Sequence, residues 1–128
     1  MSKIVDKWLK ISRRDLMGAE FNLNGPDELL AFAGFLAQQS AEKAIKGFLT
    51  AHQKKFTKTH NIAALLVKVA EVNSELAESI STAGDLTDFA IKYRYPEALE
   101  KDLTRQDTEA GVTLAKSVRE KIIEALGG

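Results

Sequence analysis

Apolar residues along this chain recur at intervals of three and four positions rather than alternating with polar ones, which predicts helices throughout. The first predicted helix runs from about Ser2 to Phe21 and ends at the turn NLNGP, residues 22–26. The second, about 27–53, carries apolar residues on most of its circumference, as expected for a helix at the centre of a bundle. Pro26 suits the start of this second helix, because the N–H that proline lacks would have no intrahelical partner there.

Three more helices are predicted in the second half of the chain. The third begins near Thr59, whose hydroxyl is expected to cap it, and the fourth covers roughly 74–93 and stops before Pro96. The fifth opens at Thr104, with Asp107 three residues later, and ends at Gly127. The pattern therefore predicts an all-α fold, an antiparallel up-and-down bundle of four long helices plus one short helix, in a single domain over residues 1–128.

Composition limits the classes of partner. Eighteen basic residues balance eighteen acidic ones, so no overall basic field draws the protein to DNA or to an anionic membrane, and any contact with RNA must be local. The chain has no cysteine, no signal-like start and no apolar run long enough to span a bilayer, which favours a cytoplasmic protein. Its two histidines are not accompanied by a metal-binding motif, so we expect neither a metal nor another cofactor.

A polar stripe interrupts the apolar surface of the second helix. At about 3.6 residues per turn, Gln38, Glu42 and Lys46 fall on one line, and Gln39 and Lys43 flank it. Stripes of this kind usually face water, where their ion pairs contribute little to stability. The alternative is one wall of a cleft, whose amide and ammonium groups would bind a phosphate or a base.

Two interpretations also stand for the KTHNI segment at 58–62. His60, beside the free N–H groups of a helix start, could help to bind an anion, although a lone histidine is more often a capping or packing residue. The lysine-rich loop before it favours solvated charges over phosphate contacts. This loop cluster consists of His52, Lys54, Lys55 and Lys58.

The segment YRYP at 93–96 combines a planar guanidinium with two aromatic rings at the end of a helix. Arg94 offers a fork of donors that suits a phosphate, and Tyr93 and Tyr95 offer stacking surfaces that suit a base. Equally, Arg94 could bind the last free carbonyls of the helix while the tyrosines close the end of the bundle.

Taken together, four segments resemble the HEPN domain family: WLKISRRDLMGA at 8–19, AQQSAEKAIKGFL at 37–49, KTHNI at 58–62 and LTDFAIKYRYP at 86–96. The resemblance spans roughly residues 8–120. It implies a helical bundle related to the helical half of certain nucleotidyltransferases, usually a homodimer and often encoded beside a minimal nucleotidyltransferase.

Many members of that family are metal-independent ribonucleases with an Arg, four to six residues, and then a His. Here Arg94 is followed by YPEALEKDLTRQ, and no histidine occurs beyond His60, so the resemblance does not supply the general acid or base. We therefore predict no catalytic residue and a nucleotide-binding or interaction module, for an ATP-like nucleotide or RNA, that works with a nucleotidyltransferase partner. The alternatives are a ribonuclease toxin of a toxin–antitoxin pair with a non-standard site, and a dimeric adaptor that only docks a partner. The predicted ligand-binding residues are Gln39, Lys43, His60, Tyr93, Arg94 and Tyr95.

Overall fold

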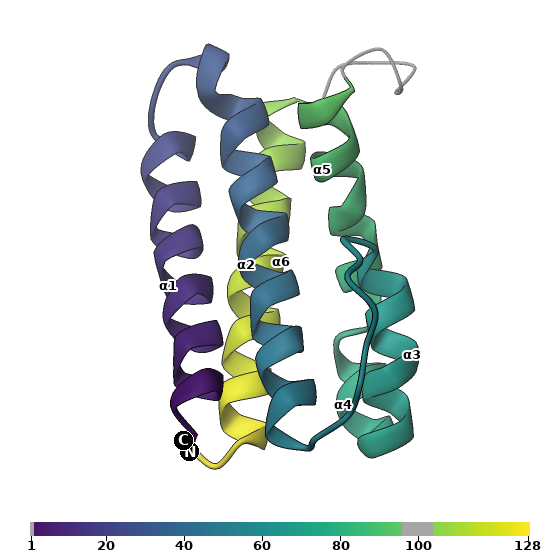
Figure 1. The fold of residues 1–128 in the computed structure, drawn as a ribbon. Helices are drawn as coiled ribbons and strands as arrows, with labels where there is room; N and C mark the ends of the chain where they lie inside the picture. Colours follow the sequence, from purple (N-terminus) through teal and green to yellow (C-terminus); the bar gives the residue numbers. More distant parts are fainter. Residues whose placement is uncertain (1, 96–103) are drawn as a thin grey trace.

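The structure, a computed structural model, describes residues 2–95 and 104–128, and within these ranges every regular element is a helix (Figure 1). The predicted all-α antiparallel bundle is therefore confirmed. In chain order the elements are α1 (Lys3–Leu23), the 3-10 helix η1 (Asp27–Leu29), α2 (Leu30–Ala51), α3 (Ile62–Val72), α4 (Ser74–Ser79), the 3-10 helix η2 (Ser81–Leu86), α5 (Thr87–Arg94) and α6 (Arg105–Ala125).

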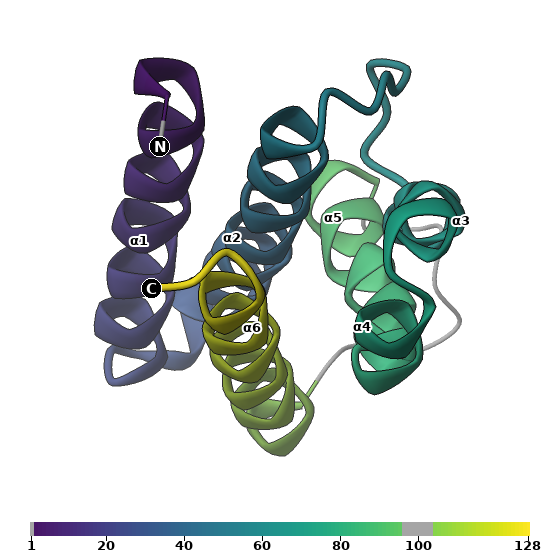
Figure 2. The same cartoon turned by 90° about the horizontal axis from the view of Figure 1, so that it is seen from below.

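Helix α2 lies at the centre, as its apolar circumference predicts. It packs against α1, α6, α5 and α3, and the end-on view of Figure 2 shows it between α1 and the α3–α5 side of the molecule. Phe48, Ile45 and Leu49 are at most 1% exposed, and burying each such side chain contributes about 1.5–3 kcal/mol. This packing on several sides sets the position of the α2 backbone relative to α1, α3, α5 and α6.

Small residues allow α1 and α2 to approach closely. The Ser12 hydroxyl donates to the Ser40 carbonyl at 2.8 Å, and the Ser40 hydroxyl donates to the Ser12 carbonyl at 2.8 Å. Near the start of α1 and the end of α2, a Cβ added to Gly47 would lie 3.1 Å from the Cβ of Trp8. This is shorter than most contacts that Cβ atoms make in proteins, so the glycine allows the close approach. The contact between the two helices is thus fixed by paired hydroxyls and by a glycine.

The predicted fourth helix differs in detail, because residues 74–93 form α4, η2 and α5 rather than one continuous helix. The break begins at Ile80 and contains the sequence STAGD, whose serine, threonine, glycine and aspartate are weak helix formers. Helix α5 ends at Arg94; Pro96, which was expected to stop it, lies outside the described residues.

Helix starts follow local capping signals, though not always at the predicted residue. The capping box of Thr104 and Asp107 is confirmed at the start of α6. The prediction that Thr59 caps α3 is wrong, because the Asn61 side chain accepts from the Ala64 N–H and the helix begins at Ile62. Asparagine competes well for this position, since its short side chain reaches the free N–H groups of the first turn.

The ring of Phe89 fixes α5 against the rest of the bundle. A Cβ on Gly34 would lie 2.3 Å from this ring and a Cβ on Gly111 would lie 2.6 Å from it, so the ring fits only because both positions, on α2 and α6, are glycine. Phe89 is 7% exposed. One turn further along α5 come Tyr93 and Arg94, whose positions relative to α2 are therefore set by this contact.

Candidate functional site

Three polar residues of the α2 stripe are buried. Gln38 and Glu42 are 0% exposed and Lys46 is 7% exposed, so the interpretation of these three as a solvated face is wrong. The cause lies outside the helix, since the segment 52–61 between α2 and α3 runs back across the front of the molecule (Figure 1). The Gln38 amide donates to the backbone carbonyl of His60 in that segment at 3.0 Å.

The carboxylate of Glu42 is the centre of the buried group. Its Oε1 accepts hydrogen bonds from Gln38 Nε2 at 3.1 Å and from His60 Nδ1 at 2.9 Å. Its Oε2 accepts from Lys46 Nζ at 2.9 Å and from Lys43 Nζ at 3.3 Å. A carboxylate out of contact with water is thus satisfied by four donors, which is the condition under which a buried charge is tolerated.

The pKa of Glu42 reflects two opposing effects. Burial raises it, but the hydrogen bonds from Lys46 and His60 and the charges of Lys43 and Lys46 outweigh burial, so the pKa lies below the ordinary value of 4.5. Because the ionised carboxylate only accepts hydrogen bonds, the Nδ1 of His60 must carry the proton. The Nε2 atom is then the free position of a ring whose side chain is 57% exposed.

A second group joins α5 to α2 through aromatic rings. The rings of Tyr93 and Phe35 stack at 4.5 Å between centroids, with 19° between their planes, and Phe32 lies 5.7 Å from Tyr93. The guanidinium carbon of Arg94 lies 4.8 Å from the centre of the Phe35 ring. Stacking on a ring holds both polar side chains on α2 rather than free in solvent.

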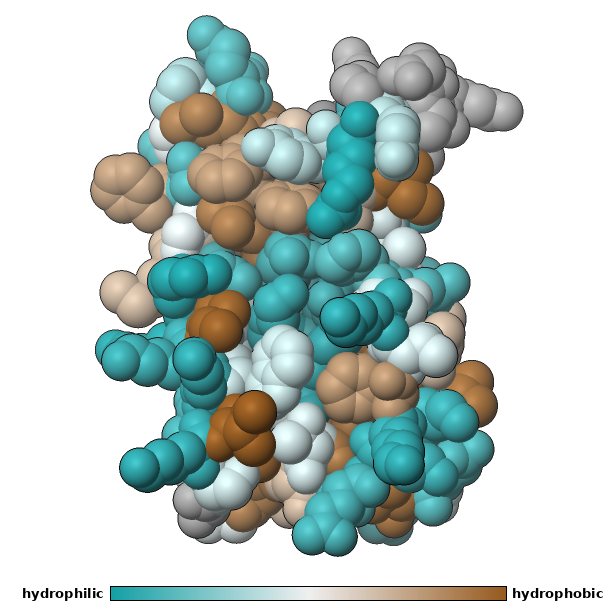
Figure 3. Space-filling view, viewed as in Figure 1, coloured by the Kyte–Doolittle hydropathy of each residue, from teal (hydrophilic) through white to brown (hydrophobic). Residues whose placement is uncertain are grey.

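The predicted site residues therefore meet in two places on one side of α2. Lys43 and His60 meet at Glu42, while Tyr93 and Arg94 meet at Phe35. Figure 3 shows this side of the molecule, with a hydrophobic region over the upper part of α2 and a hydrophilic band directly below it.

Among the described residues, the other two predicted ones, Gln39 and Tyr95, form no hydrogen bond or ring contact with either group. Gln39 lies four residues after Phe35 and four before Lys43, so all three project from the same side of α2. Its Oε1 is buried and has no hydrogen-bond partner among the described residues. Tyr95 follows the end of α5 with 59% of its surface exposed, and its side chain makes no ring contact or hydrogen bond with a described residue. That these six side chains bind a ligand stays a prediction.

Phe35 and Glu42 connect the predicted residues, yet neither was predicted as a site residue. The signal for Phe35 was its four-residue spacing to Gln39 and Lys43, which places it on the same side of the helix. The contact between Glu42 and His60 had no local signal, because the two residues are 18 positions apart.

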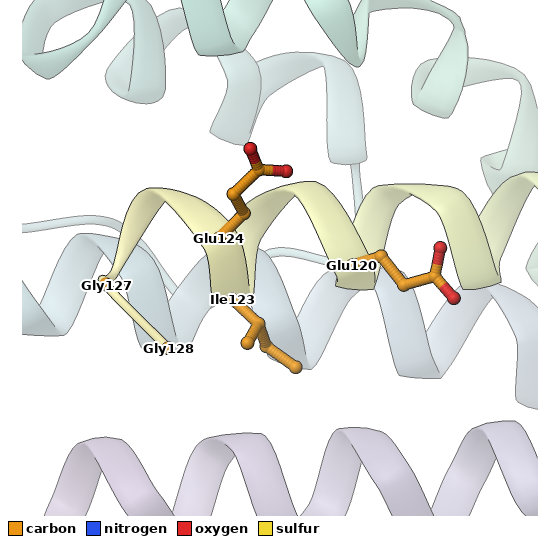
Figure 4. Close-up of a pocket in the computed structure, with 5 residues that line it drawn as sticks. All are labelled: Glu120, Ile123, Glu124, Gly127 and Gly128. Carbon is orange, nitrogen blue, oxygen red and sulfur yellow. The ribbon is translucent and has the colours of Figure 1, made fainter.

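One hollow in the described part of the chain lies at the end of α6, away from these two groups. This hollow (Figure 4) has a volume of about 550 Å³ and is lined by Glu120, Ile123, Glu124, Gly127 and Gly128. Its two carboxylates point away from one another, so the hollow offers no converging polar groups. Within the described ranges, no group of three or more His, Asp or Glu side chains could hold a metal ion, and no helix is long and apolar enough to cross a membrane.

Comparison with known proteins agrees with the fold. The HEPN domain family model matches residues 5–126 of this chain. The crystal structure of TT1696 from Thermus thermophilus is 30% identical and covers 96% of this chain and 98% of its own, with a TM-score of 0.78. The crystal structure of ST0689, an archaeal HEPN homologue, is 23% identical and covers 98% of both chains, with a TM-score of 0.73. No curated protein matches the chain.

Proposed function

The chain belongs to the HEPN domain family, and from this premise we propose that it is a noncatalytic nucleotide-binding module that acts with a nucleotidyltransferase partner. The observation that supports binding most strongly is the stack of Tyr93 and Arg94 on Phe35, on the same side of α2 as Gln39 and Lys43. An aromatic surface, a guanidinium and an ammonium group within one surface are the components that nucleotide recognition needs.

Each residue has a separate part in the proposed binding. Tyr93, which is 43% exposed, offers the outer face of its ring to a base, and Arg94 offers a planar pair of N–H donors to a phosphate. Lys43 adds positive charge for a second phosphate, and the free Nε2 of His60, whose ring proton is on Nδ1, accepts a hydrogen bond from a ribose hydroxyl. Because the surface is open rather than enclosed, both an ATP-like nucleotide and single-stranded RNA fit this arrangement.

Titration with ATP, GTP and short RNA oligomers in a calorimeter tests this proposal. Replacing Arg94 by alanine is expected to weaken binding by roughly ten- to a hundredfold, because a hydrogen bond to a charged group contributes about 1.5–3 kcal/mol. Arg13→Ala is the matched control, since it removes the same charge from an exposed position on α1. Absence of binding to all of these ligands at millimolar concentration would refute the proposal.

The nucleotidyltransferase partner and a homodimer are supported by membership of the family rather than by a contact in this chain. Sedimentation of the purified protein distinguishes a dimer from a monomer of 14.1 kDa. Co-purification with a nucleotidyltransferase encoded nearby tests the partner. A monomer that binds no such enzyme would remove this part of the proposal and leave the nucleotide site open.

The contact between Glu42 and His60 favours one second candidate, a metal-independent ribonuclease with a non-standard site. A buried carboxylate that binds Nδ1 fixes the tautomer of the ring and leaves Nε2 to accept a proton, which is the arrangement of a general base. Positioned in this way, His60 would take the proton of an RNA 2′-hydroxyl while Lys43 stabilises the phosphate charge.

Incubation of structured RNA with the protein in EDTA tests the second candidate. Cleavage should require His60 and be lost in His60→Asn, while His52→Asn should cleave normally, because His52 is the only other histidine and lies on the ring of Phe48. Equal cleavage by the two variants, or none by the wild type, would exclude it.

A further inference from the structure

The outward side of α1 carries two parallel rows of side chains, one partly covered by the bundle and one exposed along its whole length. The partly covered row is apolar and consists, at helical spacing, of Ile4, which is exposed, and of Trp8 and Ile11, which are half-buried. Beside it runs a row that is basic at first and apolar at its end, consisting of Lys3, Lys7, Lys10, Arg14, Met17 and Phe21. Ile4, Met17 and Phe21 are 58%, 57% and 80% exposed, which is unusual for three large apolar side chains on one helix.

A hollow of about 160 Å³ lies in the apolar row. Ile4, Lys7, Trp8 and Ile11 line it, and nearly all of its surface is apolar. The ring of Phe56, in the segment between α2 and α3, packs edge-on against Trp8 with 6.5 Å between the ring centroids. A hollow of this size and polarity accepts one apolar side chain and gives no stabilisation to a phosphate.

Three of the four basic side chains in this row have no acidic partner within the described part of the chain. Lys3, Lys7 and Lys10 are exposed and form no ion pair there, and Arg14 binds Asp15 through one guanidinium nitrogen and Nε while remaining 72% exposed. Four basic groups at intervals of four, three and four residues therefore follow one edge of the apolar row. A partner that covers the row would bring its own negative charges.

We infer that this side of α1 docks an amphipathic helix of a partner protein, with apolar residues at intervals of three and four and with Asp or Glu along one edge. A helix of that kind places one side chain in the hollow at Trp8 and its carboxylates against the basic row. The inference is independent of the nucleotide site, because none of the residues that carry it was assigned there.

Charge argues against the α1 of a second copy as the occupant. If two antiparallel α1 helices packed on these rows, Lys7 and Lys10 of one copy would lie against Lys10 and Arg14 of the other. If the two helices were parallel, each basic side chain would lie against the same side chain of the other copy. Such contacts are unfavourable.

Trp8 reports binding directly, because it is the single tryptophan of the chain and lines the hollow. The full chain is titrated with a designed acidic helical peptide that carries leucines at positions i, i+3, i+4 and i+7 and glutamates on one edge. A second peptide keeps the leucines and carries a lysine in place of each glutamate, and it serves as the matched control. We expect the acidic peptide to shift the Trp8 emission to shorter wavelength with at least roughly tenfold higher affinity.

Charge reversal completes the test. The double variant Lys7→Glu, Lys10→Glu should reverse the preference between the two peptides, while Lys68→Glu, Lys116→Glu, which reverses two charges on α3 and α6, should retain it. The inference is overturned if neither peptide shifts the Trp8 emission or if both bind equally. It is also overturned if anionic phospholipid vesicles shift the emission more than the acidic peptide, or if the emission changes with the concentration of the protein alone.

Discussion

Replacing Glu42 by glutamine is the most informative single change in this protein. The side chain keeps its shape but loses its charge, and its new NH₂ group meets donors where Oε1 or Oε2 accepted hydrogen bonds before. Lys46, 7% exposed, would then carry a charge with no carboxylate beside it. The variant therefore converts a satisfied buried group into an unsatisfied one.

Removal of one partner of a buried ion pair costs about 3–5 kcal/mol. We expect a value near the lower limit, about 3 kcal/mol, because the amide oxygen still accepts one hydrogen bond and the Lys46 ammonium lies 5.9 Å from the centre of the Phe56 ring. Against a total stability of about 5–15 kcal/mol, this loss should lower the melting temperature by roughly 10 °C.

Urea unfolding at pH 7 measures the loss, and two variants sharpen it. Glu71→Gln is the matched control, since Glu71 forms an exposed pair with Lys54 and the change should leave the unfolding midpoint nearly unchanged. Adding Lys46→Met to Glu42→Gln removes the unpaired ammonium and should restore at least half of the loss.

The loss should also depend on pH in one direction. Because the pKa of Glu42 is lowered in the folded protein, the unfolded chain binds more protons on acidification, so the contribution of Glu42 is complete above about pH 4.5 and is lost as the pH falls further. Glutamine does not titrate, so the gap between wild type and Glu42→Gln should narrow below that pH. Equal midpoints at pH 7, or a gap that widens in acid, would refute the reasoning.

Two further changes test the packing and the capping of the helices. Gly34→Ala and Gly111→Ala should each destabilise the protein by about 1–3 kcal/mol, because the added methyl group meets the Phe89 ring, and adding Phe89→Leu should relieve part of the loss in thermal unfolding. Thr104→Ala should lose about 1 kcal/mol with the capping box of α6, whereas Thr113→Ala, at an exposed position within the same helix, should lose nothing by the same measurement.

The fold was predictable because its signals are local. Apolar spacing defined the long helices, and the pair Thr104 and Asp107 marked a helix start that depends only on residues three apart. The break at 80–86 was missed, since a run of weak helix formers lowers the stability of a helix without dictating where it ends. Thr59 and Asn61 can both cap a helix, and the sequence between them does not indicate which one does.

The burial of the polar stripe was not predictable from α2 alone. Residue type and spacing place Gln38, Glu42 and Lys46 on one line, but their exposure depends on the segment 52–61, which returns over the helix and contains His60. Only a contact between residues far apart in the sequence distinguishes a solvated stripe from a buried ion network. For the same reason, the stacking of Tyr93 on Phe35 required the structure.

Glu42 contributes both to stability and to the proposed site, and this limits how the site is tested. The carboxylate holds Lys43 and His60 in place, so a Glu42 variant that loses binding has also lost part of its fold. Arg94 lies on the surface of the Phe35 ring and takes no part in the buried network, so its removal separates binding from stability. If Arg94→Ala weakens ligand binding at an unchanged melting temperature, the loss comes from the binding surface and not from the fold; loss of binding only together with a lower melting temperature would contradict this separation.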